Sequence, residues 1–142
     1  MGLFFVIFSM KHYLKIFAFI LALSNITAQE SQTTLAILDF EGRGINSLEA
    51  ATLTDRFTSE IGKTETMTLV DRTMVEEILK EQGFQQTGCT TDECAVEVGA
   101  MLGVQFMISG AIGKLGDTFT IDAKMVSVES GSSVETRNVT YI

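Results

Sequence analysis

The chain has 142 residues, which is enough for one domain, and a formal net charge of −8. Its only histidine lies within the first 28 residues, so the remainder lacks the side chain that Ser-His-Asp catalysis, Cys-His catalysis and most zinc sites require. We therefore expect a non-enzymatic domain with no catalytic residues, no cofactor and no metal ligands.

Residues 1–28 have the pattern of a secretory signal peptide. The apolar run at 17–23 follows two lysines, and Ala28 is the small residue that a signal peptidase needs. We expect cleavage between Ala28 and Gln29, and we expect Met10 to be the true start, because the residues after it make a more usual signal-peptide start. An uncleaved membrane anchor is the alternative, but the apolar run is far short of the roughly 20 residues that a span needs.

The exported chain, residues 29–142, is strongly acidic. It keeps 8 basic and 18 acidic residues, a net charge of −10. Such a surface argues against nucleic acid, which is bound through Lys and Arg contacts to phosphate, and equally against anionic lipid. No cysteine stands directly after the expected cleavage site, so the acceptor for an N-terminal lipid is missing. We predict a periplasmic or secreted protein with no membrane span, held at the outer membrane only through a partner.

The first elements of the exported chain are a strand and a helix. The apolar run at 35–38 predicts a strand buried on both faces, and residues 41–44 predict a flexible turn. Asn46 and Glu49 form a capping box that predicts a helix over 47–62. A phosphate-binding loop at the two glycines of the turn is the alternative, although the third glycine of such a loop is missing.

A second strand and a second helix follow. Residues 67–70 predict the strand, and Thr73 predicts the helix N-cap, because Glu76 stands three residues later. Gly83 predicts the left-handed end of this helix, with Phe84 folding back on it. The order strand, helix, strand predicts a parallel pair with a right-handed crossover.

Beyond Gly83 the pattern changes from helix to strand. A third helix is predicted from a cap at Thr90, with Gly99 allowing close approach to the sheet and Gly103 ending it. Strands are predicted at 104–114, 118–128 and 134–142, with a hairpin turn at Gly116 and Asp117 between the first two.

The strand at 118–128 has two different faces. Up to Met125 the odd-numbered residues are apolar and the even-numbered ones are polar. After Met125 the even-numbered residues are the apolar ones, and this reversal predicts a bulge. The residues are Phe119, Ile121, Ala123 and Met125 on the apolar face, and Thr120, Asp122 and Lys124 on the polar face. Together the elements predict an α/β fold with a mixed sheet, parallel at its start and an antiparallel meander at its end. Two to three helices are expected to cover one face of this sheet.

Cys89 and Cys94 are the only cysteines, and they lie five residues apart in an exported chain. In an oxidising compartment such a pair favours a structural disulfide. Free thiols and a redox site remain open as alternatives. The redox site is disfavoured because the spacing is not CxxC and no nearby Lys or His would lower a thiol pKa. Two sulfurs alone do not make a metal site.

Two further groups could be mistaken for sites. The glutamates at 76, 77 and 81 follow helical spacing and predict a solvated helix face, with a calcium site or an acid/base pair as the alternative. Gly110 and Gly113 predict a bulge or a close helix-to-sheet contact rather than a ligand.

Four stretches resemble a known superfamily: LAILDF at 35–40, LTDRFTSEI at 53–61, LVDRTMVEEILKEQGF at 69–84, and GVQFMISGAIGKLGDTFTIDAKMVSVESG at 103–131. The chain resembles the CsgG-type and TolB-amino-terminal-like domains of bacterial envelopes. These domains include the curli assembly/transport component CsgG and a lipoprotein activator of penicillin-binding proteins. The resemblance covers nearly all of residues 29–142, and its marks are moderately specific only when taken together.

This resemblance implies a non-enzymatic domain that binds other envelope proteins, or itself, in an outer-membrane or periplasmic assembly or transport system. Pore formation is not carried over, because the loops are too short for the membrane hairpins of the curli pore. The family usually continues into a closing helix, so a chain that stops inside a strand at Tyr141 and Ile142 leads us to expect a truncated reading frame. A periplasmic domain that binds a small ligand or nucleotide at the loops after the first and second strands is the alternative function.

Overall fold

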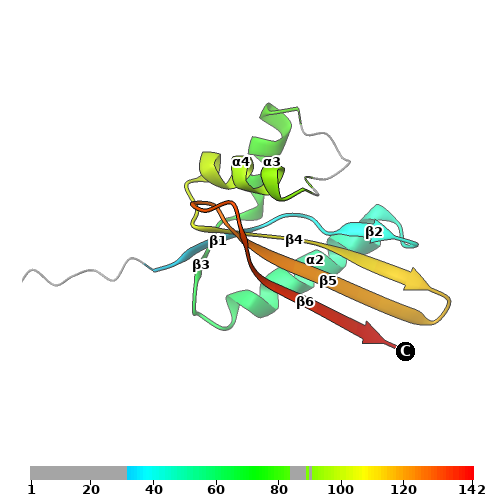
Figure 1. The fold of residues 1–142 in the computed structure, drawn as a ribbon. Coiled ribbons are helices and arrows are strands. Elements are labelled where there is room, and N and C mark those ends of the chain that lie inside the picture. Colours follow the sequence, from blue (N-terminus) through cyan, green and yellow to red (C-terminus); the bar gives the residue numbers. More distant parts are fainter. Residues whose placement is uncertain (1–31, 84–88, 90) are drawn as a thin grey trace, which may run out of the picture. The chain divides into compact units, whose positions relative to one another are not determined.

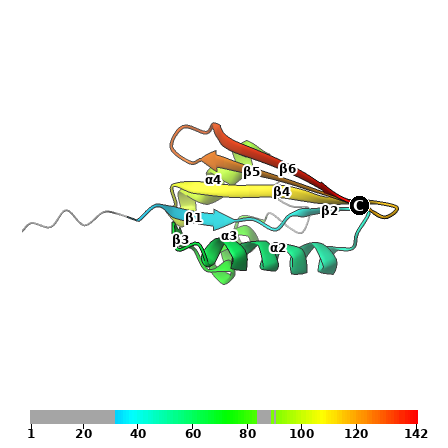
Figure 2. The same cartoon turned by 90° about the horizontal axis from the view of Figure 1, so that it is seen from below.

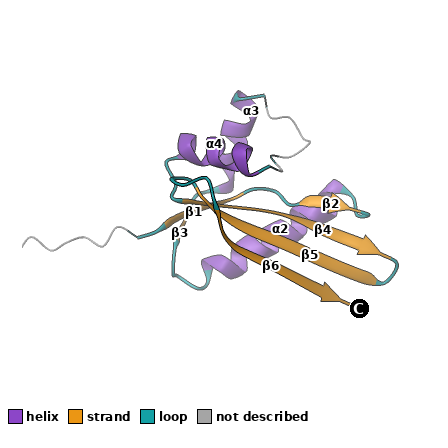
Figure 3. Ribbon diagram, in the orientation of Figure 1, coloured by secondary structure: helices purple, strands orange, loops and turns teal. Residues whose placement is uncertain are grey.

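The computed structural model describes residues 32–83, 89 and 91–142. The expected start at Met10, the expected cleavage site between Ala28 and Gln29, the cap at Thr90 and the contact of Phe84 lie outside these residues. The described part contains helices on a mixed sheet (Figures 1 and 3). The helices are α2 (Ser47–Gly62), α3 (Arg72–Glu81) and α4 (Asp92–Leu102). The strands are β1 (Thr34–Ile37), β2 (Glu41–Arg43), β3 (Thr68–Leu69), β4 (Phe106–Leu115), β5 (Thr118–Ser127) and β6 (Ser133–Tyr141).

The sheet has the strand order β3-β1-β4-β5-β6, and β2 pairs with β4 beyond the end of β1. Strand β1 pairs in parallel with both β3 and β4, and β2 is also parallel to β4. The β4–β5 and β5–β6 pairs are antiparallel. The prediction of a mixed sheet with a parallel start and an antiparallel end is therefore confirmed.

The helices cover both faces of the sheet, so the prediction that they cover one face is wrong. Strand β1 separates two core clusters because its successive side chains point to opposite faces. Leu35 and Ile37 belong to the cluster that includes Phe57 of α2. Ala36 and Leu38 belong to the cluster formed with α3 and α4. Figure 2 shows α2 and α4 on opposite sides of the sheet, and we call these sides the α2 face and the α4 face.

Strand order explains why two faces are covered. The chain crosses from β1 to β3 on one side of β1, and then from β3 to β4 on the other side. Crossovers between parallel strands are right-handed in nearly all proteins, so two crossovers in opposite directions place their helices on opposite faces. The sequence pattern predicted every strand except β2, and it did not contain the order of the strands in the sheet.

Residues 41–43 form strand β2 and not a flexible turn. Glu41 pairs with Ala111 and Arg43 pairs with Gly113, so this segment extends the sheet along the edge of β4 where β1 ends. Gly42 is packed by its own chain, because a Cβ atom there would lie 3.1 Å from Ile45 Cγ1. The glycine turn is thus part of the sheet, and its backbone is not open to a phosphate group.

Of the three predicted helix starts, one is confirmed, one is wrong and one lies outside the described residues. The capping box of Asn46 and Glu49 is present in α2 and confirms the first prediction. In α3 the N-cap is Asp71, whose side chain accepts a hydrogen bond from the backbone N–H of Thr73, so the cap predicted at Thr73 is wrong. The cap of α4 is Thr91, whose hydroxyl oxygen accepts a hydrogen bond from the N–H of Cys94.

The β-meander agrees with the sequence pattern. A two-residue turn joins Leu115 to Thr118, and a register shift between Met125 and Val126 confirms the predicted bulge. Three apolar residues of β5, Ile121, Ala123 and Met125, pack against the core cluster on the α2 face. The face of β5 opposite to them is polar over most of its length, and this face leads to the candidate site.

Gly110 and Gly113 serve close packing within the sheet, which agrees with their predicted role. A Cβ atom on Gly110 would lie 2.3 Å from the backbone oxygen of Asp122 and 3.2 Å from the ring of Phe40. A Cβ atom on Gly113 would lie 2.5 Å from the hydroxyl oxygen of Thr120. Larger side chains would displace the neighbouring strand or the core ring.

Candidate functional site

The α4 face of the sheet is only partly covered by helices. Helices α3 and α4 lie over the ends of β1 and β4 that carry Ala36 and Met107. The meander strands extend beyond these helices toward the β4–β5 hairpin, together with β2 (Figure 1). The side chains on this uncovered half of the α4 face can therefore contact another molecule.

The strand registers place polar side chains in rows across the uncovered half. One row runs from Glu41 on β2 through Ala111 and Asp122 to Asn138 on β6. A neighbouring row contains Ser109, Lys124 and Thr136, and a third begins at Arg43. The strand in the middle contributes only small side chains to these rows, whereas the strands on either side contribute long or branched polar ones.

This difference in side-chain size hollows the surface into a groove of about 270 Å³. Its floor includes Ser109 and Ala111 on β4, and its sides are formed by β2, β5 and β6. We call this feature the polar groove and define it by Glu41, Arg43, Ser109, Ala111, Asp122, Lys124, Thr136 and Asn138.

Charges of both signs line the polar groove. Arg43 Nη2 donates to Glu41 Oε2 at 2.9 Å, and this bond raises the pKa of Arg43 and lowers the pKa of Glu41. Lys124 Nζ lies 2.9 Å from Asp92 Oδ1 at the start of α4. A groove with exposed ion pairs and a small-residue floor suits a partner that inserts polar side chains, and it offers no reactive group.

A second hollow, of about 390 Å³, lies on the α2 face between the start of α2 and the β4–β5 hairpin. Its lining is mainly apolar and includes Ile45, Leu48, Leu53 and Phe119. Lys114 Nζ lies 4.8 Å from the centre of the Phe119 ring, and Leu48 is 75% exposed. This apolar hollow is a second surface of the described residues at which a protein could dock.

The loops after β1 and β3 carry an ion-pair cluster that the sequence pattern did not reveal. Arg72 Nη2 lies 2.8 Å from Asp39 Oδ1, and Arg72 Nε lies 2.8 Å from Glu76 Oε1. Arg72 also pairs with Asp55 of α2. One guanidinium thus faces three carboxylates, and the four groups together carry a formal charge of −2. This charge disfavours the binding of a nucleotide phosphate or another anion at the loops after the first and second predicted strands, where the alternative ligand site was expected.

Asp39 has a perturbed pKa within this cluster. Burial of its carboxylate raises the pKa above the ordinary value of 3.8, and the neighbouring Arg72 opposes this rise. Because the folded-state pKa is the higher one, Asp39 favours the folded state most below pH 3.8. That contribution is lost as the pH rises through the folded-state pKa.

We expect the substitution Arg72→Met to raise the pKa of Asp39 further. The guanidinium lowers this pKa through its charge and its hydrogen bond, and methionine retains neither. An NMR titration of the Asp39 carboxyl carbon measures the shift. Arg56→Met is the matched control, because Arg56 pairs with Glu60 on the solvent side of α2. A pKa of Asp39 that stays unchanged or falls in Arg72→Met would contradict the described cluster.

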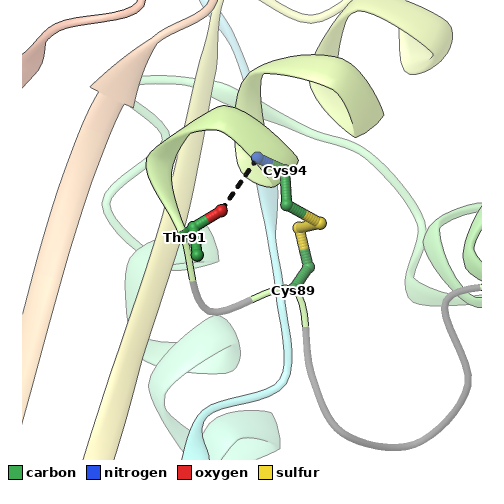
Figure 4. The surroundings of a disulfide bond; sticks show 3 residues. All are labelled: Cys89, Thr91 and Cys94. Carbon is green, nitrogen blue, oxygen red and sulfur yellow. Dashed lines mark hydrogen bonds between the residues drawn. A yellow bond between two sulfur atoms is a disulfide. The ribbon is translucent and has the colours of Figure 1, made fainter.

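The structure joins Cys89 and Cys94 by the expected disulfide, with 5.4 Å between their Cα atoms. Figure 4 shows the bond beside the start of α4, where Thr91 caps the helix through the N–H of Cys94. Cys89 is 8% exposed and belongs to the α4-face core cluster. The bond therefore fastens the first turn of α4 to the chain before it.

We expect Cys94→Ser to lower the free energy of unfolding by about 2 kcal/mol, the loop-closure entropy of a ring this small. Chemical unfolding measured by circular dichroism tests this value. Reductant should produce the same loss in the unsubstituted chain and no further loss in the variant. Unchanged stability with lost biological activity would instead favour the redox alternative.

The other sequence-based candidates behave as parts of the scaffold. Glu76, Glu77 and Glu81 are exposed on α3, as predicted for a solvated helix face. No cluster of three or more metal-ligating side chains occurs among residues 32–83, 89 and 91–142. In the same residues, no helix combines the length and hydropathy required to cross a bilayer.

The polar groove was only half visible in the sequence. The alternation of Thr120, Asp122 and Lys124 with apolar residues indicated a polar face on β5, and that face is confirmed. The contribution of Arg43 was missed, because its segment was interpreted as a turn. Thr136 and Asn138 could have been found by applying the same alternation to the last strand.

A protein-family profile described as "Peptidoglycan-synthase activator LpoB" matches residues 17–134 of the chain. No curated protein sequence matches the chain at a significant level. The profile match covers most of the chain, including every described helix, strands β1 to β5 and the first two residues of β6.

Solved structures from several bacteria have the same fold. The C-terminal domain of LpoB from Escherichia coli is 15% identical, with a TM-score of 0.66, and the match covers 82% of this chain and 87% of that one. The NMR structure of E. coli LpoB is 16% identical with a TM-score of 0.66, and the match covers 78% of this chain and 58% of that one. The lipoprotein GNA1162 from Neisseria meningitidis is 11% identical with a TM-score of 0.64, and the match covers 77% of this chain and 79% of that one.

Proposed function

Because the chain belongs to the LpoB family of peptidoglycan-synthase activators, we propose that it activates a peptidoglycan synthase in the periplasm by binding it through the polar groove. The family membership confirms the resemblance to the superfamily that includes an activator of penicillin-binding proteins. It also agrees with a non-enzymatic role, since the family is one of activators. A role in curli transport gains no support from this match.

The observation that carries the proposal is the uncovered half of the α4 face. Helices cover the rest of that face, and the exposed rows present charged side chains of both signs around a floor of small residues. Interfaces between proteins that associate reversibly are about as polar as other surfaces, and arginine is over-represented among the residues that dominate their binding energy. The polar groove has this composition, and Arg43 is its exposed arginine.

The apolar hollow on the α2 face is a poorer match to a reversible activator. Its lining is mainly apolar, with Glu49 and Lys114 as its charged residues, and its Leu48 is 75% exposed. A synthase that used this hollow would depend on Leu48 rather than on Arg43. The two surfaces can therefore be separated by substitution.

The experiment measures the rate of glycan-chain synthesis by a purified peptidoglycan synthase of the same bacterium, with and without the exported chain. The proposal predicts a faster rate, together with a saturable binding isotherm between the two proteins. Unchanged synthase activity and no detectable binding at high micromolar concentration would overturn it. Loss of binding in Leu48→Glu, with none in substitutions of the groove, would move the docking surface to the apolar hollow.

A further inference from the structure

Strand β6 forms an edge of the sheet that has no partner within the described residues. It pairs with β5 on one side only, and all nine of its residues are exposed. An edge of this length presents a row of unpaired N–H and C=O groups, which is a template for another strand. The strand contains no proline and is rich in Val, Thr and Tyr, which favour β-structure.

The hairpin between β4 and β5 fixes which backbone groups of β6 point outward. A two-residue turn closes on the hydrogen-bonded pair of Leu115 and Thr118, and hydrogen-bonded pairs alternate along antiparallel strands. Even-numbered residues of β5 therefore bond to β4, and odd-numbered ones bond to β6. The N–H of Ser127 follows this rule, because it donates to the carbonyl oxygen of Ser132 at 3.0 Å.

The register between β5 and β6 determines which residues of β6 direct their backbone groups toward the outer edge of the sheet. Ile121 lies opposite Val139 and Ala123 lies opposite Arg137, so from residue 135 to residue 141 the odd-numbered residues of β6 bond to β5. The even-numbered residues of this stretch, which include Thr136, direct their N–H and C=O groups away from the sheet. Those groups are available to a second strand without any loss of pairing to β5.

We propose that two copies of this chain associate through their β6 strands, antiparallel and centred on Thr136. In this register Thr136 faces its own copy as a hydrogen-bonded pair. Glu135 of each copy then lies directly opposite Arg137 of the other, in the closely spaced non-hydrogen-bonded position. The strand thus carries complementary charges on either side of the symmetry point.

Neighbouring registers lack this complementarity. Centring the pair on Arg137 places two guanidinium groups opposite each other, and like charges in this position are destabilising. Centring it on Asn138 places Glu135 opposite Tyr141. Within one chain Glu135 Oε1 already lies 2.8 Å from Arg137 Nε, so the two side chains are on the same face and can exchange partners across the edge.

The resulting dimer would have one continuous sheet. A two-fold axis perpendicular to the sheet keeps the α4 faces of both copies on the same side. The two polar grooves would then adjoin across the pair of β6 strands. This inference depends on the edge strand alone, so its test does not depend on whether the chain binds a synthase.

The test is sedimentation equilibrium of the exported chain over a range of concentrations. We expect a monomer–dimer equilibrium, and we expect Glu135→Arg to raise the dissociation constant at least about tenfold, because two ion pairs become two repulsive pairs. The double variant Glu135→Arg with Arg137→Glu restores opposite charges in the same register. We expect its dissociation constant to return to within about threefold of the original value.

Two proline variants provide a matched backbone test. Thr136→Pro removes an outward N–H at the centre of the pairing, whereas Thr140→Pro removes an outward N–H beyond its end. The first should abolish dimers and the second should preserve them, with both variants keeping the circular dichroism spectrum of the folded chain. A chain that stays monomeric at every concentration, a dimer unaffected by Glu135→Arg, or a double variant that is not restored would each overturn the proposal.

Discussion

Replacing Arg43 by glutamate is expected to weaken synthase binding about thirtyfold and to abolish most of the activation. Arg43 is the exposed arginine at the β2 side of the polar groove, and central arginines typically contribute about 2 kcal/mol or more to an interface. The substitution places a carboxylate beside Glu41, so it also reverses the local charge. Isothermal titration calorimetry with the synthase measures the dissociation constant.

Arg56→Glu is the matched control for this change. Both arginines are exposed and each pairs with one glutamate, but Arg56 lies on α2, away from the polar groove. The two variants have the same net charge, so long-range electrostatics affect them alike. Equal weakening by both variants would mean that overall charge, and not the polar groove, determines binding.

Gly110→Ala is expected to lower the free energy of unfolding by about 2 kcal/mol or more. The added Cβ atom would lie 2.3 Å from the backbone oxygen of Asp122 and 3.2 Å from the ring of Phe40. A backbone oxygen in a paired strand cannot swing away as a flexible side chain can, so β4 and β5 must separate locally. Urea unfolding followed by circular dichroism measures the loss.

Gly62→Ala makes the same chemical change where there is room. The nearest atom to its Cβ would be Leu69 Cδ1 at 3.4 Å, an ordinary van der Waals contact. Alanine is favoured over glycine in a helix, so this variant should be as stable as the original chain or more stable by up to about 1 kcal/mol. A larger loss in Gly62→Ala than in Gly110→Ala would contradict the described packing of β4.

The sequence predicted those features of the fold that depend on a few neighbouring residues. The capping box of Asn46 and Glu49 predicted the start of α2, and the alternation ending at Met125 predicted both faces of β5 and its bulge. A helix start is harder to predict where two residues that can cap it lie close together in the sequence. Asp71 caps α3 two residues before the expected Thr73, since either side chain could accept the backbone hydrogen bond.

The sequence pattern did not predict which residues far apart in the chain lie side by side in the fold. Arg72 lies beside Asp39 and Asp55 only because β3 and β1 are neighbours and α2 crosses back over them. Segment 41–43 has two polar residues around a glycine, so only its pairing with β4 makes it a strand. The polar face of β5 was predicted, but its exposure depends on which half of the sheet α4 covers.

The position of β1 in the sheet affects how the chain reaches its folded state. The first strand to leave a translocation channel is the one that must lie in the middle, between β3 and β4. Phe106, the partner of Leu35 on β4, lies 71 residues later in the chain. Contacts between such distant residues form slowly, because the long intervening loop must close first.

The meander can instead form from neighbouring segments as soon as they emerge. In the export that residues 1–28 predict, the apolar residues of β1 would therefore remain without their β4 partner until most of the chain has crossed. Transiently exposed apolar surface favours aggregation, so we expect the chain to be most prone to aggregation during this interval.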